Sequence, residues 1–332
     1  MSSNKKRDPK TRIQLLLLML FITTIYLSTA TYAWFSVNRV VYIAGLSIKV
    51  QAEGGIEISA DGQNWKTVLS YLDIIDAHSN YSTSLNQLPL AMGPVSTGKK
   101  VTNGKLEIYH GHTENTMSSY ILFANRSIEE EGHGEESEGN FIVFDFFMKS
   151  ESVQNLYLTN LSGAKYRGTS PGIENSVRFA FLNEGTADLT ASKDYIQSLN
   201  NATESTTYIW EPNYDVHTVH GISNASNVYG ISLNETGNSR VPYDGIISEI
   251  SKTDNITIGN ANETNYPDKF RRVNVDYATK TDFDTNIELF SLPRGITKIR
   301  VYIWIEGQDV DCEDNSSVGD IDFDFQLSVN PA

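Results

Sequence analysis

The sequence predicts an all-β protein: an antiparallel β-sandwich or jelly roll with long decorated loops, preceded by an N-terminal apolar helix that is a signal or an anchor. Three observations predict this class. Short segments repeatedly alternate apolar and polar residues, Gly, Asn, Ser and Asp fill the joints between them, and no apolar stripe of helical period is sustained. With 332 residues, 39% of them hydrophobic, the chain can bury a substantial core.

The N-terminus has the pattern of a secretory signal. A Lys/Arg-rich start is followed by an uncharged run from Leu15 to Phe35, and Ala30, Thr31 and Ala33 supply small residues at its exit. We expect cleavage after Ala33, with the bond after Ala30 as the second choice. The run is also about long enough to span a bilayer, so an uncleaved membrane anchor is the alternative. Both readings place the rest of the chain outside the cytoplasm.

The clearest strand segments lie near the two ends of the remaining chain. Residues 44–52 place Leu46, Ile48 and Val50 on one strand face. Residues 298–306 and 320–329 alternate in the same way, and we expect them to pair as a final hairpin. Further strands are expected at residues 105–110, 120–124, 141–149, 155–161, 176–182 and 206–210.

Helical signals are few, and no clean domain boundary is visible. Residues 68–78 and 194–201 each have the composition of a short helix. Residues 211–280 are rich in Asn, Ser, Thr and Gly, with weaker alternation. We therefore expect a signal peptide or membrane anchor over residues 1–33. A single extracellular β-sandwich domain follows over 34–332, with an insertion around 211–280.

Charge and cysteine content restrict the partners of this chain. The formal net charge of -15 argues against nucleic acid and anionic lipid surfaces, because both would repel it. The single cysteine, Cys312, excludes an intrachain disulfide. A secreted domain of this kind must therefore be held together by core burial alone.

The acidic stretch before the last predicted strand is the best candidate for a metal site. Hard carboxylate oxygens that converge on one loop suit Ca²⁺, the one cofactor we consider. The proposed ligands are Asp309, Asp311, Glu313 and Asp314. The alternative is a solvated outer face, because Asp320, Asp322 and Asp324 alternate with apolar residues as outward-facing side chains do.

No pattern in the chain indicates catalysis. The sequence has no HExxH zinc motif, no GxSxG nucleophile and no Gly-rich phosphate loop. His110 and His112 share one face of a predicted strand, and His217 and His220 are further potential ligands. These histidines lie scattered in polar segments, so we expect surface histidines and no enzymatic activity.

Residues 29–50, TATYAWFSVNRVVYIAGLSIKV, resemble the TasA/camelysin family of Gram-positive secreted proteins. That family has a signal ending in a small residue, an aromatic residue and Ala, with Phe just beyond the cut and a Gly-containing alternating strand shortly afterwards. Tyr32, Ala33, Phe35 and Gly45 occupy these positions here. The signals of the family are processed by a dedicated signal peptidase.

This resemblance implies a jelly-roll subunit of an extracellular matrix fibre, in which the N-terminal segment freed by cleavage is donated as a strand to the next subunit. The donated strand would contain Trp34, Phe35, Val37, Val40 and Tyr42. We therefore expect a non-enzymatic protein of the cell surface or biofilm matrix of a Gram-positive-type bacterium. It would form a homo-oligomer or fibre, and its N-terminal segment would lie in the membrane until cleavage.

Two alternatives remain open. The first is a membrane-anchored adhesin or binding module, with the Tyr- and Asn-rich loops as its binding surface. The second is a metal-dependent hydrolase, because camelysin carries a metallopeptidase label. The chain shows no zinc motif that would support the second alternative.

Overall fold

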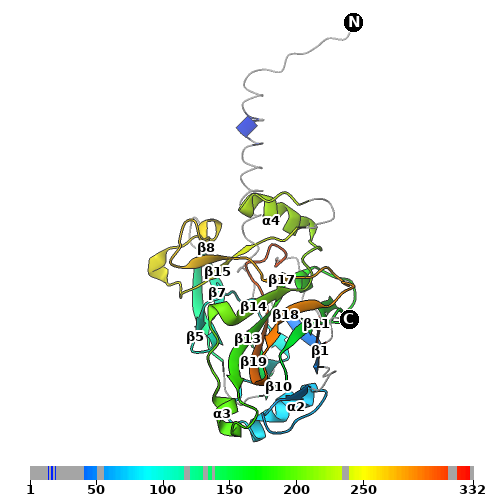
Figure 1. Cartoon of the computed structure of the whole chain (residues 1–332). Coiled ribbons are helices and arrows are strands. Elements are labelled where there is room, and N and C mark those ends of the chain that lie inside the picture. The colour runs from blue at the N-terminus through cyan, green and yellow to red at the C-terminus, as the bar shows by residue number, and fades with distance from the viewer. Residues whose placement is uncertain are drawn as a thin grey trace.

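The computed structural model describes residues 41–50, 56–115, 120–129, 134–136, 139–233, 239–312 and 320–329, together with Gln14, Leu16, Leu17 and Met19. Over these residues the protein is all-β with a few short helices (Figure 1), as the alternation predicts. Among them no helix has both the length and the apolar character needed to cross a membrane. Most of the expected N-terminal apolar helix lies outside the described residues.

Two mixed sheets make up the body of the protein. Sheet A contains, in spatial order, β18 (Ile287–Leu292), β11 (Gln154–Leu158), β20 (Asp320–Ser328), β1 (Val41–Val50) and β4 (Ala91–Met92), with β12 (Gly163–Tyr166) also paired to β20. Sheet B contains β17 (Tyr277–Ala278), β14 (Thr207–Glu211), β13 (Val177–Ala187), β19 (Gly295–Ile305), β10 (Ile142–Ser150), β3 (Gln87–Pro89) and β9 (Gly134–Glu136), with β2 (Glu57–Ser59) also paired to β10.

Three hairpins and several short helices complete the described structure. The hairpins are β5–β6 (Val101–Thr102, Lys105–Leu106), β7–β8 (Ile108–Asn115, Tyr120–Ser127) and β15–β16 (Tyr243–Ile246, Phe270–Val273). The α-helices are α2 (Tyr71–Ile75), α3 (Lys193–Ser198) and α4 (Val219–Tyr229). The 3₁₀ helices are Asp76–Ser79, Ile173–Ser176, Glu204–Thr206, Lys252–Asp254 and Ile258–Asn260. Figure 1 shows α4 at one end of the molecule and α2 and α3 at the other.

The apolar faces of the two sheets pack against each other and form the main core. Phe325 of β20 lies 5.4 Å from Phe181 of β13 and 6.3 Å from Phe146 of β10, measured between ring centroids. Phe323 of β20 meets Phe179 of β13 edge to face at 6.2 Å. Each fully buried side chain of this size contributes about 1.5–3 kcal/mol, so this layer is the main source of stability.

Sheet B is buried on its other face as well. Tyr302 and Trp304 of β19 share a second apolar cluster with Leu106 of β6, Ile108 of β7 and Tyr243 of β15. The hairpins therefore cover the face of β19 that alternation alone would assign to solvent. A third cluster joins the β7–β8 and β15–β16 hairpins to each other.

The predicted final hairpin is wrong. β19 lies in sheet B between β13 and β10, whereas β20 lies in sheet A beside β1. Both strands turn their alternating apolar residues toward the same core, but from opposite sides of it. Alternation identifies the apolar face of a strand and does not identify the sheet to which the strand belongs.

β1 is the first described strand of the sandwich, and it runs parallel to β20 rather than antiparallel. Leu46 lies opposite Phe323 and Val50 opposite Leu327. A parallel pair needs a long connection, which is available here because these strands come from opposite ends of the chain. On its other side β1 pairs with β4 only at Val41 and Tyr42. Beyond Tyr42 that edge of β1 has no strand partner among the described residues.

The expected helices are confirmed as α2 and α3, each with a serine N-cap, whereas α4 was not predicted. Thr218 caps the N-terminus of α4 by accepting a hydrogen bond from the Gly221 amide, and Gly230 ends the helix in the left-handed conformation at φ 67°. α4, β15 and β16 all come from residues 211–280. This region therefore contains ordered elements that contact the sandwich, and not only loops.

Candidate functional site

The described part of the acidic loop after β19, residues 306–312, buries two of its aspartates. The side chains of Asp309 and Asp311 are buried, at 5% and 1% exposure. Asp309 accepts hydrogen bonds from the Asp311 amide at 2.8 Å and from the Arg178 guanidinium. The expectation of a solvated outer face therefore fails for these two residues, whereas Asp322 and Asp324 are half-buried on the outward side of β20.

Arg178 of β13 is the centre of this acidic group and is fully buried. Its Nη2 donates to Glu211 Oε1 at 3.0 Å as well as to Asp309, and its Nη1 donates to the carbonyls of Asn175 and Val177 at 3.0 and 2.9 Å. The planar guanidinium can satisfy several acceptors at once, which an ammonium cannot do in the same geometry. The arrangement joins β13, β14 and the acidic loop.

His217, just before α4, connects the start of this helix to the acidic loop by hydrogen bonds. Its Nδ1 lies 2.6 Å from Asp311 Oδ2 and its Nε2 lies 3.3 Å from the Ser239 carbonyl, while the Thr218 amide donates to Asp311 Oδ1 at 2.7 Å. Burial alone would lower the pKa of His217, but the hydrogen bond to Asp311 raises it to about 9. The imidazole is therefore protonated at neutral pH and forms a buried ion pair.

The buried centre around Arg178 contains more carboxylates than cations. Burial raises the pKa of Glu211 and of Glu306 to about 7, although Arg178 favours the ionised form of both. Glu211 Oε2 and the Tyr243 hydroxyl are buried without a hydrogen-bond partner among the described residues. With pKa values of about 7, Glu211 and Glu306 change their protonation in the neutral pH range.

Calcium binding stays a prediction. Glu313 and Asp314 lie outside the described residues, and Asp309 and Asp311 already pair with Arg178 and His217. Over the part of the chain that the structure describes, no group of three or more His, Cys, Asp or Glu side chains could hold a metal ion.

The calcium prediction is tested by thermal unfolding. Addition of 5 mM Ca²⁺ is expected to raise the melting temperature by about 1 °C or more, because a ligand bound only by the folded state stabilises it by mass action. The same concentration of Mg²⁺ is the control, since Mg²⁺ dehydrates reluctantly and suits a different site. Melting curves that coincide in Ca²⁺, Mg²⁺ and EDTA would contradict the prediction.

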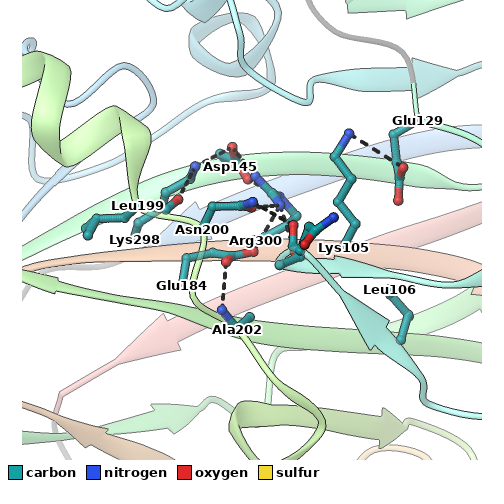
Figure 2. A network of polar contacts seen from close by, with 12 residues as sticks. Lys105, Leu106, Glu129, Asp145, Glu184, Leu199, Asn200, Ala202, Lys298 and Arg300 are labelled. Atoms are coloured by element: carbon teal, nitrogen blue, oxygen red, sulfur yellow. Dashed lines mark hydrogen bonds and ion pairs between the residues drawn. The ribbon is translucent and has the colours of Figure 1, made fainter.

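A second buried polar centre lies on the outer face of sheet B, where Asp145, Glu184, Lys298 and Arg300 converge (Figure 2). Arg300 Nε and Nη2 donate to the two carboxylate oxygens of Asp145 at 2.7 and 3.1 Å. Burial alone would raise the pKa of Asp145, but Arg300 and Lys298 lower it to about 2. Asp145 is therefore ionised throughout the physiological range.

This second centre holds two segments against the outer face of sheet B, the β5–β6 turn and residues 199–202, by hydrogen bonds. Arg300 Nη1 donates to the Gly104 carbonyl in the β5–β6 turn at 2.8 Å, and Lys298 donates to the Leu199 carbonyl at 2.8 Å. Glu184 accepts from the Ala202 amide at 3.0 Å, and burial raises the pKa of Glu184 to about 7. These contacts are made with backbone groups of the two segments. The role of this centre is therefore structural, because it holds the segments in place on the sheet.

The N-terminal predictions fall largely outside the described residues. These are the cleavage site at Ala33 and the assembly residues Trp34, Phe35, Val37 and Val40. Tyr42 is described, and its backbone lies in β1 opposite Asp320 of β20 and Ala91 of β4 in the same chain. The described part of the predicted assembly strand therefore belongs to the sheet of its own subunit.

Sequence reasoning missed Arg178 and Glu211, although one signal for Arg178 was present. In the strand that contains it, Val177 and Phe179 face the core, so Arg178 falls on the opposite face together with the apolar Ala180 and Leu182. Apolar residues on both faces indicate a strand that is covered on both sides. A charged residue within such a strand needs a buried partner.

The histidine pairs do not form the ligand set considered from the sequence. His110 and His112 lie on β7, where the His112 ring stacks on Phe123 with a centroid distance of 5.1 Å. His217 instead pairs with Asp311, and His220 lies exposed on α4.

Comparison with known proteins returned no relative: no family model, no curated protein and no solved structure matches this chain.

Proposed function

We propose that this chain is a secreted, non-enzymatic protein of the cell surface or extracellular matrix that assembles with copies of itself through its N-terminal segment. The position of β1 supports this proposal. β1 directly follows residues 34–40 of the predicted arm and pairs with β20 along one edge. From Ile43 onward its other edge has no strand partner among the described residues. An open strand edge is a template for a strand from another chain.

We also propose that the sandwich is of the jelly-roll kind. The chain passes from sheet B to sheet A between β10 and β11 and returns to sheet B at β13. It then crosses to sheet A at β18, to sheet B at β19 and back to sheet A at β20. Repeated crossing between two facing sheets is typical of Greek-key and jelly-roll connections. β1 and β20, the first and last described strands of the sandwich, lie side by side in sheet A, and the arm would leave the subunit there.

Cleavage after Ala33 is part of this proposal, because an arm held in the membrane cannot reach a neighbouring subunit. Mass spectrometry of the secreted protein is expected to give an N-terminus at Trp34. A mature protein that retains residue 1 would contradict assembly by a freed arm and would favour the membrane-anchored binding module instead.

Filament formation tests the assembly step directly. Negative-stain microscopy of residues 34–332 is expected to show filaments, and the Val37→Pro/Val40→Pro variant is expected to show none, because proline cannot donate a ladder hydrogen bond. Ser36→Ala is the matched control, since it keeps every backbone donor of the arm. Filaments in the proline variant, or none in the parent protein and the control, would contradict the proposal.

A further inference from the structure

A hollow of about 500 Å³ opens on the outer side of sheet A, between β12, β20 and the loop that precedes β18. The residues that matter for its chemistry are Asn160, Leu161, Lys165, Phe283, Asp284 and Asp324. They combine carboxylates, an amide and one ammonium group with one aromatic and one aliphatic side chain. Its volume lies in the usual range for sites that bind small molecules.

The walls of this hollow are held in place by specific hydrogen bonds. The Gln326 amide donates to Ser162 Oγ at 2.9 Å, and the Gln326 carbonyl accepts from the Thr159 amide at 2.9 Å. In the facing loop, the Thr281 amide donates to Asp215 Oδ1 at 2.8 Å. The hollow is therefore formed before a ligand arrives, which lowers the entropic cost of binding.

The carboxylate of Asp324 is the group in this hollow with which a cationic ligand would pair. Its neighbour in β20, Asp322, is held by both Arg167 Nε and Nη2 at 2.7 Å. Asp324 instead lies opposite Gly163, which has no side chain, and the nearby Lys165 is bound to Asp282 at 2.9 Å. Asp324 is half-buried, and its carboxylate has no hydrogen bond or ion pair with any described residue.

The remaining lining restricts the class of ligand. Leu161 is 65% exposed and Phe283 is half-buried, so the hollow offers apolar surface beside its polar groups. Three aspartates, Asp282, Asp284 and Asp324, face one lysine in the lining, which disfavours acidic ligands. A ligand that fits must have a cationic group that pairs with a carboxylate and hydroxyl groups that form hydrogen bonds with the amide of Asn160. It must also have a face of C–H groups that packs against the apolar surface.

We propose that this hollow binds a saccharide that carries free amino groups. The ammonium group would pair with Asp324, the hydroxyl groups would bond to Asn160 and Asp284, and the sugar ring would lie against Phe283 and Leu161. This inference goes beyond the proposed assembly and does not depend on it, because the hollow lies within one subunit and contains no residue of the N-terminal arm.

Calorimetric titration of the full-length protein with a glucosamine trisaccharide in 150 mM salt tests the proposal. We expect saturable binding at one site per chain. The fully N-acetylated trisaccharide is expected to bind at least about tenfold more weakly, because it lacks the charge that pairs with Asp324. No saturable binding of the glucosamine trisaccharide, or equal binding of both trisaccharides, would overturn the proposal.

Two variants locate the binding to the hollow. Asp324→Asn is expected to weaken binding of the glucosamine trisaccharide at least about tenfold. Asp320→Asn removes the same charge from an exposed position on the same strand and should leave the affinity within about twofold. Circular dichroism and melting curves check that both variants fold. Equal effects of the two variants would show general attraction to an acidic protein and would refute the assigned site.

Discussion

Arg300→Ala is expected to lower the free energy of unfolding by about 3–5 kcal/mol, because it leaves a buried carboxylate without its main partner. Asp145 is fully buried and receives two hydrogen bonds from Arg300. The substitution also removes the donor that holds the Gly104 carbonyl of the β5–β6 turn. The cost arises mainly from the charge left behind and not from the attraction that is lost.

Arg167→Ala is the matched control for that prediction. Arg167 also forms a bidentate ion pair with an aspartate, Asp322, in which both hydrogen bonds are 2.7 Å long. The side chain of Arg167 is 56% exposed, however, whereas that of Arg300 is 4% exposed. Solvent screens an exposed pair of this kind, so its loss should change stability far less than the loss of Arg300. Urea unfolding of the two variants measures the difference, and similar losses in both would contradict the buried-charge argument.

Arg300→Lys separates charge from geometry at the same site. Lysine keeps the positive charge but cannot reproduce the planar fork that meets both oxygens of Asp145. We expect a loss intermediate between the parent protein and Arg300→Ala. A variant as stable as the parent would show that the charge alone matters at this position.

The main core was predictable because its signal is local. Alternation placed Ile299, Val301, Ile303 and Ile305 on one face of a strand, and the structure buries these four residues between the sheets. The same reasoning placed Asp322 and Asp324 on the outward side of β20, where they lie. Side-chain direction in a strand has a period of two residues, so a short window of sequence is enough to assign the two faces.

The sheet assignment and the outer layer were not predictable in the same way. β19 and β20 look like a hairpin in the sequence, yet they belong to different sheets, because the choice of partner depends on contacts distant in the chain. Arg178 and Asp309 meet across 131 positions of sequence, and no local pattern encodes that meeting. His217 was singled out as a potential metal ligand, but its partner Asp311 is visible only once α4 is placed.

The second large effect expected is a loss of stability as pH rises from 5 to 9. Burial raises the pKa of Glu184, Glu211 and Glu306 to about 7, from the ordinary value of 4.5. A group whose pKa is raised by folding contributes its full stability below the unfolded pKa and loses it as pH passes through the folded pKa. These three carboxyl groups therefore contribute their full stability below about pH 4.5, and that contribution is lost as pH rises to about 7–8.

His217 extends the same trend to higher pH. Its pKa is raised from 6.5 to about 9, so its contribution is complete below pH 6.5 and is lost as pH rises through 9. Asp145 acts in the opposite sense, because its pKa is lowered to about 2 and its contribution is lost only in strong acid. The curve of stability against pH should therefore have its maximum on the acidic side of neutrality.

The expected size of the effect follows from the same pKa values. A tenfold change in an ionisation equilibrium corresponds to about 1.4 kcal/mol, so each buried glutamate contributes up to about 3 kcal/mol across this range. Thermal unfolding at pH 5.5, 7.0 and 8.5 should show the melting temperature falling by roughly 5–15 °C from the first to the last.

Glu306→Gln identifies the origin of that slope. The amide oxygen can still accept a hydrogen bond from the Trp304 indole, which donates to Glu306 at 3.0 Å in the parent protein, but the side chain no longer ionises. The variant should therefore lose less stability than the parent between pH 5.5 and 8.5, and the two curves should converge or cross at alkaline pH. Curves that stay parallel over the whole range would show that Glu306 does not titrate there, because a group that changes its protonation must change the slope of stability against pH.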